Sequence, residues 1–144
     1  MDGVVAGALA WAPSGLPSTI HALTTGRDLL EPVRAAGTLL VPSGSSAPAL
    51  LASGAAAHTG LSLGWALLLA FALPERLTVA AGVAAGLLIA GLDLGVVGRR
   101  YPAIGALPTA PQVGDHLVFA AGVALVVRRR RRRRRPTVID QWGG

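Results

Sequence analysis

One acidic residue lies inside an otherwise uncharged apolar stretch, and it is the first place to look for chemistry. Asp93 is the only charged residue between Leu77 and Gly98. Ionisable groups at membrane depth are costly, and they often mark proton, ion or substrate sites. On a helix, Asp93 shares a face with Gly82 and Gly86, so we expect it to face protein and not lipid. It is a candidate proton or cation site, and the alternative is a structural, hydrogen-bonded Asp near the arginines that follow.

The histidines have no metal-ligand spacing. His21, His58 and His116 form no His-x-x-x-His or Glu-x-x-His pair, and the chain has no cysteine, so we expect no metal and no cofactor. His116 follows Asp115 near the start of the last apolar stretch, where an Asp is more often a helix N-cap than a catalytic group. The ordinary interpretation of each histidine is a hydrogen-bonded interior or interfacial side chain.

Residues 13–19 (PSGLPST) interrupt the first apolar stretch. The prolines and glycine predict a broken helix, with one half near Val4–Ala12 and a second from about Pro17 to Thr25, closed by Gly26. The N-terminus of the second half, with the Ser18 hydroxyl, could receive an anion or solute, as in transporters with discontinuous helices. A proline kink is the simpler alternative. The candidate polar intramembrane site is therefore Asp93, Ser18, His21, Asp115 and His116.

The composition indicates the elements that must position these side chains. The chain is 52% hydrophobic and 14% charged, against about 25% charged residues in soluble domains. Aromatic residues make up only 4%, while there are 19 glycines. Small residues and aliphatic side chains in this mixture are typical of helices packed closely in lipid. We therefore predict an integral, multi-pass protein of the cell membrane.

Two stretches are long enough to cross a bilayer without difficulty, Leu50–Leu73 and Leu77–Gly98. A third, Val113–Val127, is short unless it starts near Leu107, with Pro108 and Pro111 in the way. With the broken first stretch, the predicted fold is an all-α transmembrane bundle of about four segments. Residues 1–127 would form its single domain.

A short amphipathic helix is also predicted, from Asp28 to about Val41. The pair Asp28-x-x-Glu31 resembles a capping box. Arg27, Glu31 and Arg34 then lie on one side and leucines on the other, which is typical of a helix in the membrane interface.

Glycines four residues apart recur along the chain and allow close approach of helix backbones. We expect packing inside one bundle more than dimerisation, with other membrane subunits or self-association as the alternative. The predicted packing positions are Gly60, Gly64, Gly82, Gly86, Gly91 and Gly95.

All 13 basic residues are arginine, and eight of them form one run that begins directly after Val127. This run predicts a flexible polybasic tail, 128–144, held in the cytoplasm and bound to anionic lipid headgroups. Nucleic acid is a less favoured partner, because no aromatic residues are interleaved to stack bases. The predicted headgroup ligands are Arg128, Arg129, Arg130, Arg131, Arg132, Arg133, Arg134 and Arg135.

Two stretches, PSTIHALTTGRDLLEPVRAAG (17–37) and DLGVVGRRYPAIGALPTAPQVGDHLVF (93–119), resemble small integral membrane proteins of actinobacterial type that have no assigned activity. The resemblance implies membrane location and a helical bundle only. We expect a non-enzymatic helical subunit or accessory factor of a membrane assembly. The alternative is a small oligomeric transporter or channel that uses the broken first helix and Asp93. A membrane enzyme is the least favoured hypothesis, because it needs Asp93, Asp115 and a histidine to converge.

Overall fold

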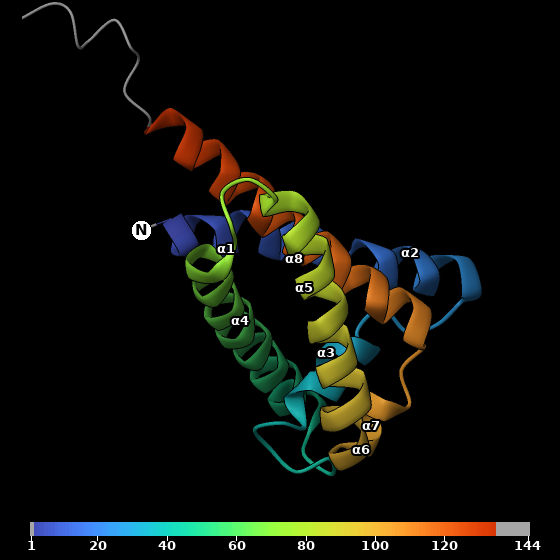
Figure 1. The fold of residues 1–144 in the computed structure, drawn as a ribbon. Coiled ribbons are helices and arrows are strands. Elements are labelled where there is room, and N and C mark those ends of the chain that lie inside the picture. Colours follow the sequence, from blue (N-terminus) through green and yellow to red (C-terminus); the bar gives the residue numbers. More distant parts are fainter. Residues whose placement is uncertain (1, 135–144) are drawn as a thin grey trace, which may run out of the picture.

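The computed structural model describes residues 2–134, and in this range every regular element is helical (Figure 1). The helices are α1 (Asp2–Ser14), α2 (Leu16–Thr25), α3 (Glu31–Gly37), α4 (Ala47–Ala72), α5 (Thr78–Leu92), α6 (Gly98–Arg100), α7 (Pro102–Gly105) and α8 (Thr109–Arg133). A π-helical turn, η1 (Asp93–Val97), joins α5 to α6.

Three of the described helices are long and apolar enough to cross a membrane. They are α4 with 26 residues, the continuous helix Thr78–Arg100 with 23, and α8 with 25. Their outer faces are strongly apolar: Phe71 is 90% exposed and Leu88 75% exposed. Large exposed apolar surfaces are unfavourable in water and natural in lipid. The chain is therefore an all-α protein with three candidate membrane spans, which indicates a multi-pass membrane protein.

The first apolar stretch forms two short helices instead of one long helix. α1 has 13 residues and α2 has 10, and each is shorter than the roughly 20 residues that a crossing helix needs. The break falls at Gly15, inside the predicted interval, and Gly26 ends α2 with a positive φ of 70°. Hydroxyl groups stabilise the break, since Ser14 donates to the carbonyl of Trp11 at 2.7 Å and Thr19 donates to that of Gly15 at 2.8 Å.

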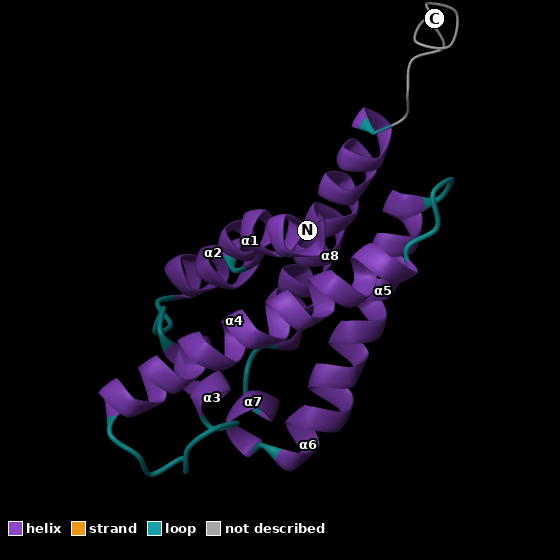
Figure 2. Cartoon of the chain, turned by 90° about the vertical axis from the view of Figure 1, so that its left-hand side faces the viewer, coloured by secondary structure: helices purple, strands orange, loops and turns teal. Residues whose placement is uncertain are grey.

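α8 is the central helix of the arrangement (Figure 2). One of its sides packs along α5 and another along α1 and α2, and its buried residues are Phe119, Ala120, Val123, Ala124 and Val127. α1 and α2 run antiparallel to α8, because Gly122 lies against Ala10 and Gly114 against Pro17. α4 packs on the other side of α1 and on α3. These contacts bring the ends of α2, α5 and α8 together at one place.

The paired glycines divide into two groups. A Cβ at Gly82 would lie 2.5 Å from the Cβ of Ala124, and one at Gly86 would lie 2.9 Å from the carbonyl oxygen of His116. These two glycines therefore bring α5 close to α8. The predicted packing inside the chain is absent at the other four positions, where an added Cβ meets nothing within 4 Å: Gly60, Gly64, Gly91 and Gly95.

α3 is shorter than predicted and packs differently. It starts at Glu31 with Leu30 as N-cap, so the predicted capping box is wrong: the Asp28 carboxylate accepts the Leu30 N–H at 2.8 Å. Gly37 of α3 and Gly54 of α4 let the two backbones touch, and a Cβ at either position would collide with a carbonyl of the other helix. α3 is thus attached to α4 by backbone contact.

α8 is longer than predicted at both ends. Pro108 is its N-cap residue and Pro111 falls in its first turn, where the missing N–H has no intrahelical partner to lose. At the other end the helix continues through Arg133, so the predicted flexible tail does not begin at residue 128. Positions 135–144 lie outside the described residues.

Candidate functional site

Asp93 and His116 form the centre of a polar cluster between α5 and α8. The Nε2 atom of His116 lies 2.8 Å from Oδ2 of Asp93, and the two side chains are 18% and 29% exposed. The contact follows from the glycines, because Gly82 and Gly86 bring the same face of α5 against α8. Asp93 therefore pairs with a histidine and not with the arginines that follow it in sequence.

The other ring nitrogen of His116 fixes how the proton is shared. Nδ1 lies 2.7 Å from the backbone carbonyl of Gln112. A carbonyl oxygen can only accept, so Nδ1 carries a hydrogen. The contact between Nε2 and a carboxylate oxygen then requires a second proton, which is either on Nε2 or on Asp93. The pair thus shares one exchangeable proton.

A π-helical turn begins at the same position. Gly98 donates its N–H to the carbonyl of Asp93, five residues back, so the regular α-helical ladder ends at Asp93. π-turns inside helices are rare and occur frequently at functional sites. Here the turn adds one residue to the helix directly after Asp93. The side chains that follow are therefore rotated about the helix axis, and the helix itself continues.

A second acid of α8 binds the start of α2. The Asp115 carboxylate accepts the backbone N–H of Ser18 at 3.0 Å and also the Ser18 hydroxyl. The predicted N-cap role of Asp115 in its own helix is wrong, since Asp115 lies well past Pro108, the N-cap of α8. Asp115 instead satisfies an unpaired N–H in the first turn of α2, where a negative charge is also favourable. This carboxylate occupies the place predicted for an anion or solute.

Gln112 links the two halves of the cluster. Its side-chain amide donates to the Ser18 hydroxyl at 2.9 Å, while its backbone carbonyl accepts from His116. Sequence reasoning missed this residue, although its position four residues before His116, one helical turn away, was the available signal.

His21 lies near this cluster without a described hydrogen bond from its ring. It lines a small surface pocket together with Ser18 and Gln112, and the charged residues at the pocket edge are Arg27, Asp28 and Glu31. These residues form ion pairs: Arg27 binds Glu31 at 2.8 Å and Arg34 binds Asp28. The Arg34 guanidinium, followed by the Leu30 N–H, holds the pKa of Asp28 below its ordinary value. Ser18 and Gln112 therefore connect the cluster to a charged surface pocket.

The structure brings four of the five predicted site residues into hydrogen-bonded contact: Asp93 with His116, and Ser18 with Asp115. The fifth, His21, is one turn away on α2. His58 has no hydrogen bond to the cluster; its ring contacts that of Trp11 at a centroid distance of 5.9 Å, and it interacts electrostatically with His116. Within residues 2–134 there is no cluster of three or more His, Asp or Glu suited to a metal ion.

The fold and the cluster define the class as an α-helical protein with three candidate membrane spans and a polar site between two of them. No protein-family model matches the chain, and neither the curated proteins nor the solved structures contain a significant match.

Proposed function

We propose that this chain is a small, non-enzymatic membrane protein that transfers protons through the Asp93–His116 pair, as a transporter or channel. The supporting observation is the double contact of His116, with Gln112 at Nδ1 and with Asp93 at Nε2. This arrangement gives the pair one proton to release and to take up again. Intramembrane acids paired with histidine are used in this way by proton relays.

Gln112 is the proposed link between the surface and the pair, because it lines the small pocket beside Ser18 and His21 and its backbone carbonyl accepts from His116. A proton taken from water on this side would pass to the pair and leave toward the opposite side of the membrane. No other atom is transferred and no oxidant is needed.

The same geometry is unsuited to nucleophilic catalysis. The hydroxyl of Ser18 donates to the carboxylate of Asp115 and not to an imidazole, whereas a serine nucleophile is activated by a hydrogen bond to a general base. This observation supports the proposal of a transport role and not an enzymatic one, even though Asp93 and a histidine do meet.

Orientation is part of the proposal. With three spans, Arg76 and the end of α8 lie at one side of the membrane, and Arg27, Arg34, Arg99 and Arg100 lie at the other. The positive-inside rule favours the side with more arginines as cytoplasmic. The proton pair is then nearer the outer side, since Asp93 lies in the second half of its span.

A pair of matched histidine variants tests the function. We expect His116→Gln to abolish proton flux into proteoliposomes that carry a potassium–valinomycin potential and an internal pH dye. His58→Gln makes the same change at a histidine that is not hydrogen-bonded to the pair but interacts electrostatically with His116, so it should reduce the flux far less than His116→Gln. Equal flux in all three proteins would show that His116 has no part in proton transfer, and it would contradict the proposal.

A second candidate function is the role of a helical subunit in a membrane assembly. It is favoured by four glycines on two candidate spans, where an added Cβ would meet no other helix of the described residues within 4 Å: Gly60, Gly64, Gly91 and Gly95. Small residues on open helix faces are used for helix–helix association in lipid. A stoichiometric partner, or a second copy, should copurify in mild detergent and be lost in Gly64→Leu. A monomer under several mild conditions would contradict this role.

A further inference from the structure

The core between the proton pair and the other end of α8 is apolar. His116 lies near the start of α8 and Arg131 near its end. Between them, residues of α8 pack with Leu69 and Leu73 of α4 and Ile89 of α5 in one hydrophobic cluster. The α8 members are Phe119, Ala120, Val123, Ala124 and Val127. Protons move through water or titratable groups, and apolar side chains provide neither. A proton that leaves the pair toward this end therefore requires the core to open.

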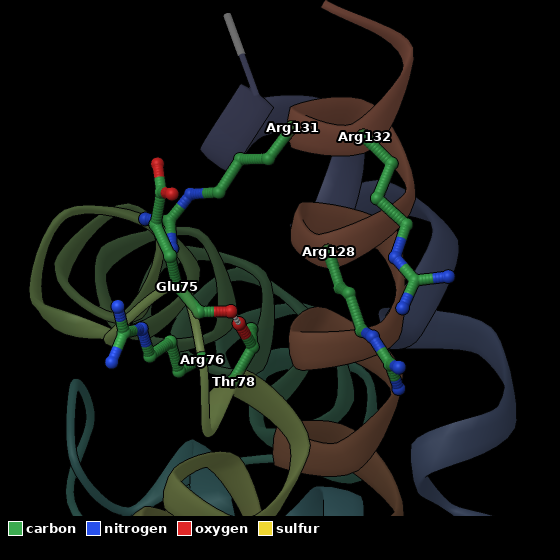
Figure 3. A pocket seen from close by; sticks show the side chains of 6 residues that line it. All are labelled: Glu75, Arg76, Thr78, Arg128, Arg131 and Arg132. Carbon is green, nitrogen blue, oxygen red and sulfur yellow. Dashed lines mark hydrogen bonds between the residues drawn. The ribbon is translucent and has the colours of Figure 1, made fainter. Parts of the chain in front are cut away.

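Arg131 joins α8 to α4 at the arginine-rich end of the bundle, where α8 carries Arg128 to Arg133. Its guanidinium donates to the backbone carbonyls of Leu73 at 2.7 Å and Ala70 at 2.8 Å. Figure 3 shows the Arg131 side chain reaching across from α8 to the α4–α5 connection. Leu73 is itself part of the core and only 5% exposed. Arg131 thus connects two candidate spans where the core ends.

The end of α4 lacks a donor that Arg131 supplies. In an α-helix the carbonyl of Ala70 would accept the N–H of the residue four positions later. That residue is Pro74, which has no N–H. Unpaired carbonyls at a helix C-terminus also carry partial negative charge, which favours a cation. The planar guanidinium of Arg131 can therefore bind the carbonyls of Ala70 and Leu73 together.

Arg131 differs from its neighbours in the arginine run. It is half-buried, whereas Arg129 and Arg133 are exposed. Each of these two arginines is two residues away from Arg131, and at about 100° per residue this places them on the opposite side of α8. They are matched positions that carry the same charge on the same helix without facing α4.

We infer that Arg131 keeps the arginine-rich end of the bundle closed, and that release of its bonds to α4 opens the core and lets a proton leave the pair. The inference rests on the proposed proton function. Gln112 links the pair to the surface at the other end, so the structure is open to protons on one side and closed on the opposite side. Transporters that face one side at a time use this arrangement.

The reactivity of a buried thiol measures the opening. Val127 is 1% exposed and lies one turn before Arg131, and the chain has no native cysteine, so Val127→Cys is a suitable probe. In nanodiscs a methanethiosulfonate reagent reaches both ends of the protein. We expect Arg131→Gln to raise the reaction rate of this thiol about tenfold, which corresponds to about 1.4 kcal/mol and is within the contribution of a hydrogen bond to a charged group.

Arg129→Gln and Arg133→Gln are the controls, because they remove the same charge from the exposed side of α8. Their rates should stay within about twofold of the rate with all arginines present, as expected for exposed charges. An equal increase in all three variants, or no increase in Arg131→Gln, would overturn the inference.

Pro74→Ala distinguishes closure from simple capping of α4. This change gives the Ala70 carbonyl an N–H from its own helix, but it does not restore the link between α4 and α8. We expect the fast thiol reaction of Arg131→Gln to persist when Pro74→Ala is added. A return to the slow rate would show that Arg131 only caps α4, and the inference would fail.

Proton flux into proteoliposomes separates this inference from the proposed function. We expect a higher flux in Arg131→Gln than in wild type, at equal amounts of folded protein, and loss of that flux when Asp93→Asn is added. Unchanged flux together with a faster thiol reaction would contradict the inference and leave the proposed function intact. Absence of flux in wild type and Arg131→Gln alike would contradict the proposed function, and the thiol reaction alone would then decide whether Arg131 closes this end.

Discussion

At the scale of single residues, the protonation of His116 follows from its two neighbours. The Gln112 carbonyl requires a hydrogen on Nδ1. We therefore expect the neutral imidazole of His116 to be the Nδ1–H tautomer. Nitrogen-15 NMR of the histidine-labelled protein distinguishes the two tautomers. A resonance of the Nε2–H form for His116 would contradict the proton arrangement described above.

Asp115 is a second residue whose structural role can be tested. Asp115→Asn keeps the size of the side chain but removes the charge that faces the N-terminus of α2, where a carboxylate contributes about 0.5–2 kcal/mol as a cap. We expect lower thermal stability, measured by circular dichroism in detergent. Ser18→Ala should have a smaller effect, because its backbone N–H still donates to Asp115. Unchanged melting of Asp115→Asn would refute the capping role.

The site was predicted from sequence only in part, and the reason is geometric. Asp93 was recognisable because a charge in an apolar span is conspicuous, and its shared face with Gly82 and Gly86 indicated that it meets protein. Its partner was not predictable, since the register of α8 against α5 depends on packing between residues far apart in sequence. Gln112 was missed for a related reason: its amide reaches Ser18 only through the packing of distant segments, and its contact with His116 uses a backbone carbonyl, which any residue type provides.

At the scale of elements, the contact between α5 and α8 depends on glycine. Gly82→Ala would place a Cβ 2.5 Å from that of Ala124, a rigid atom, so the helices must separate. Overpacking of this kind costs about 1–3 kcal/mol. Gly91→Ala, on the same helix, meets nothing within 4 Å and is the matched control. Unfolding in a mixed-detergent titration should show a loss for Gly82→Ala and none for Gly91→Ala; equal stability would contradict this packing.

The connection between α2 and α3 should respond to acid. The pKa of Asp28 is lowered by its ion pair with Arg34, so the pair contributes stability above about pH 4, the ordinary Asp pKa. This contribution is lost as the pH falls through the lowered value. The carbon-13 shift of the Asp28 carboxyl should therefore titrate below pH 4 in the native protein and at a higher pH in Arg34→Gln, where only the Leu30 N–H still lowers the pKa. Identical titrations would show that the ion pair is absent.

The elements themselves show which sequence signals are reliable. Long apolar stretches and the Pro-Ser-Gly-Leu-Pro break gave correct helix locations within a few residues. The capping signals failed at both acids, because Asp28 and Asp115 bind groups other than the N-termini of their own helices. The close contact of Gly37 with Gly54 could not be predicted from the sequence either, since neither glycine belongs to a motif in its own segment.

At the scale of the whole molecule, the three candidate spans predict which loops lie on the same side of the membrane. The absence of native cysteine allows single cysteines to be introduced without background. We expect Ser45→Cys and Ala106→Cys to react with an impermeant thiol reagent from outside intact cells, and Pro74→Cys to react only after the membrane is opened. Labelling of all three sites from one side would contradict the three-span arrangement.

In the proposed function, Asp93 is the residue that holds the exchangeable proton. The direct test is proton flux in proteoliposomes that contain wild-type protein or Asp93→Asn, at equal amounts of folded protein. Asparagine keeps the shape and can still hydrogen-bond His116, but it has no titratable proton. We predict that the flux falls by about a hundredfold or more, in the range that a positioned proton-transfer group contributes. Wild-type flux in Asp93→Asn would contradict the central claim.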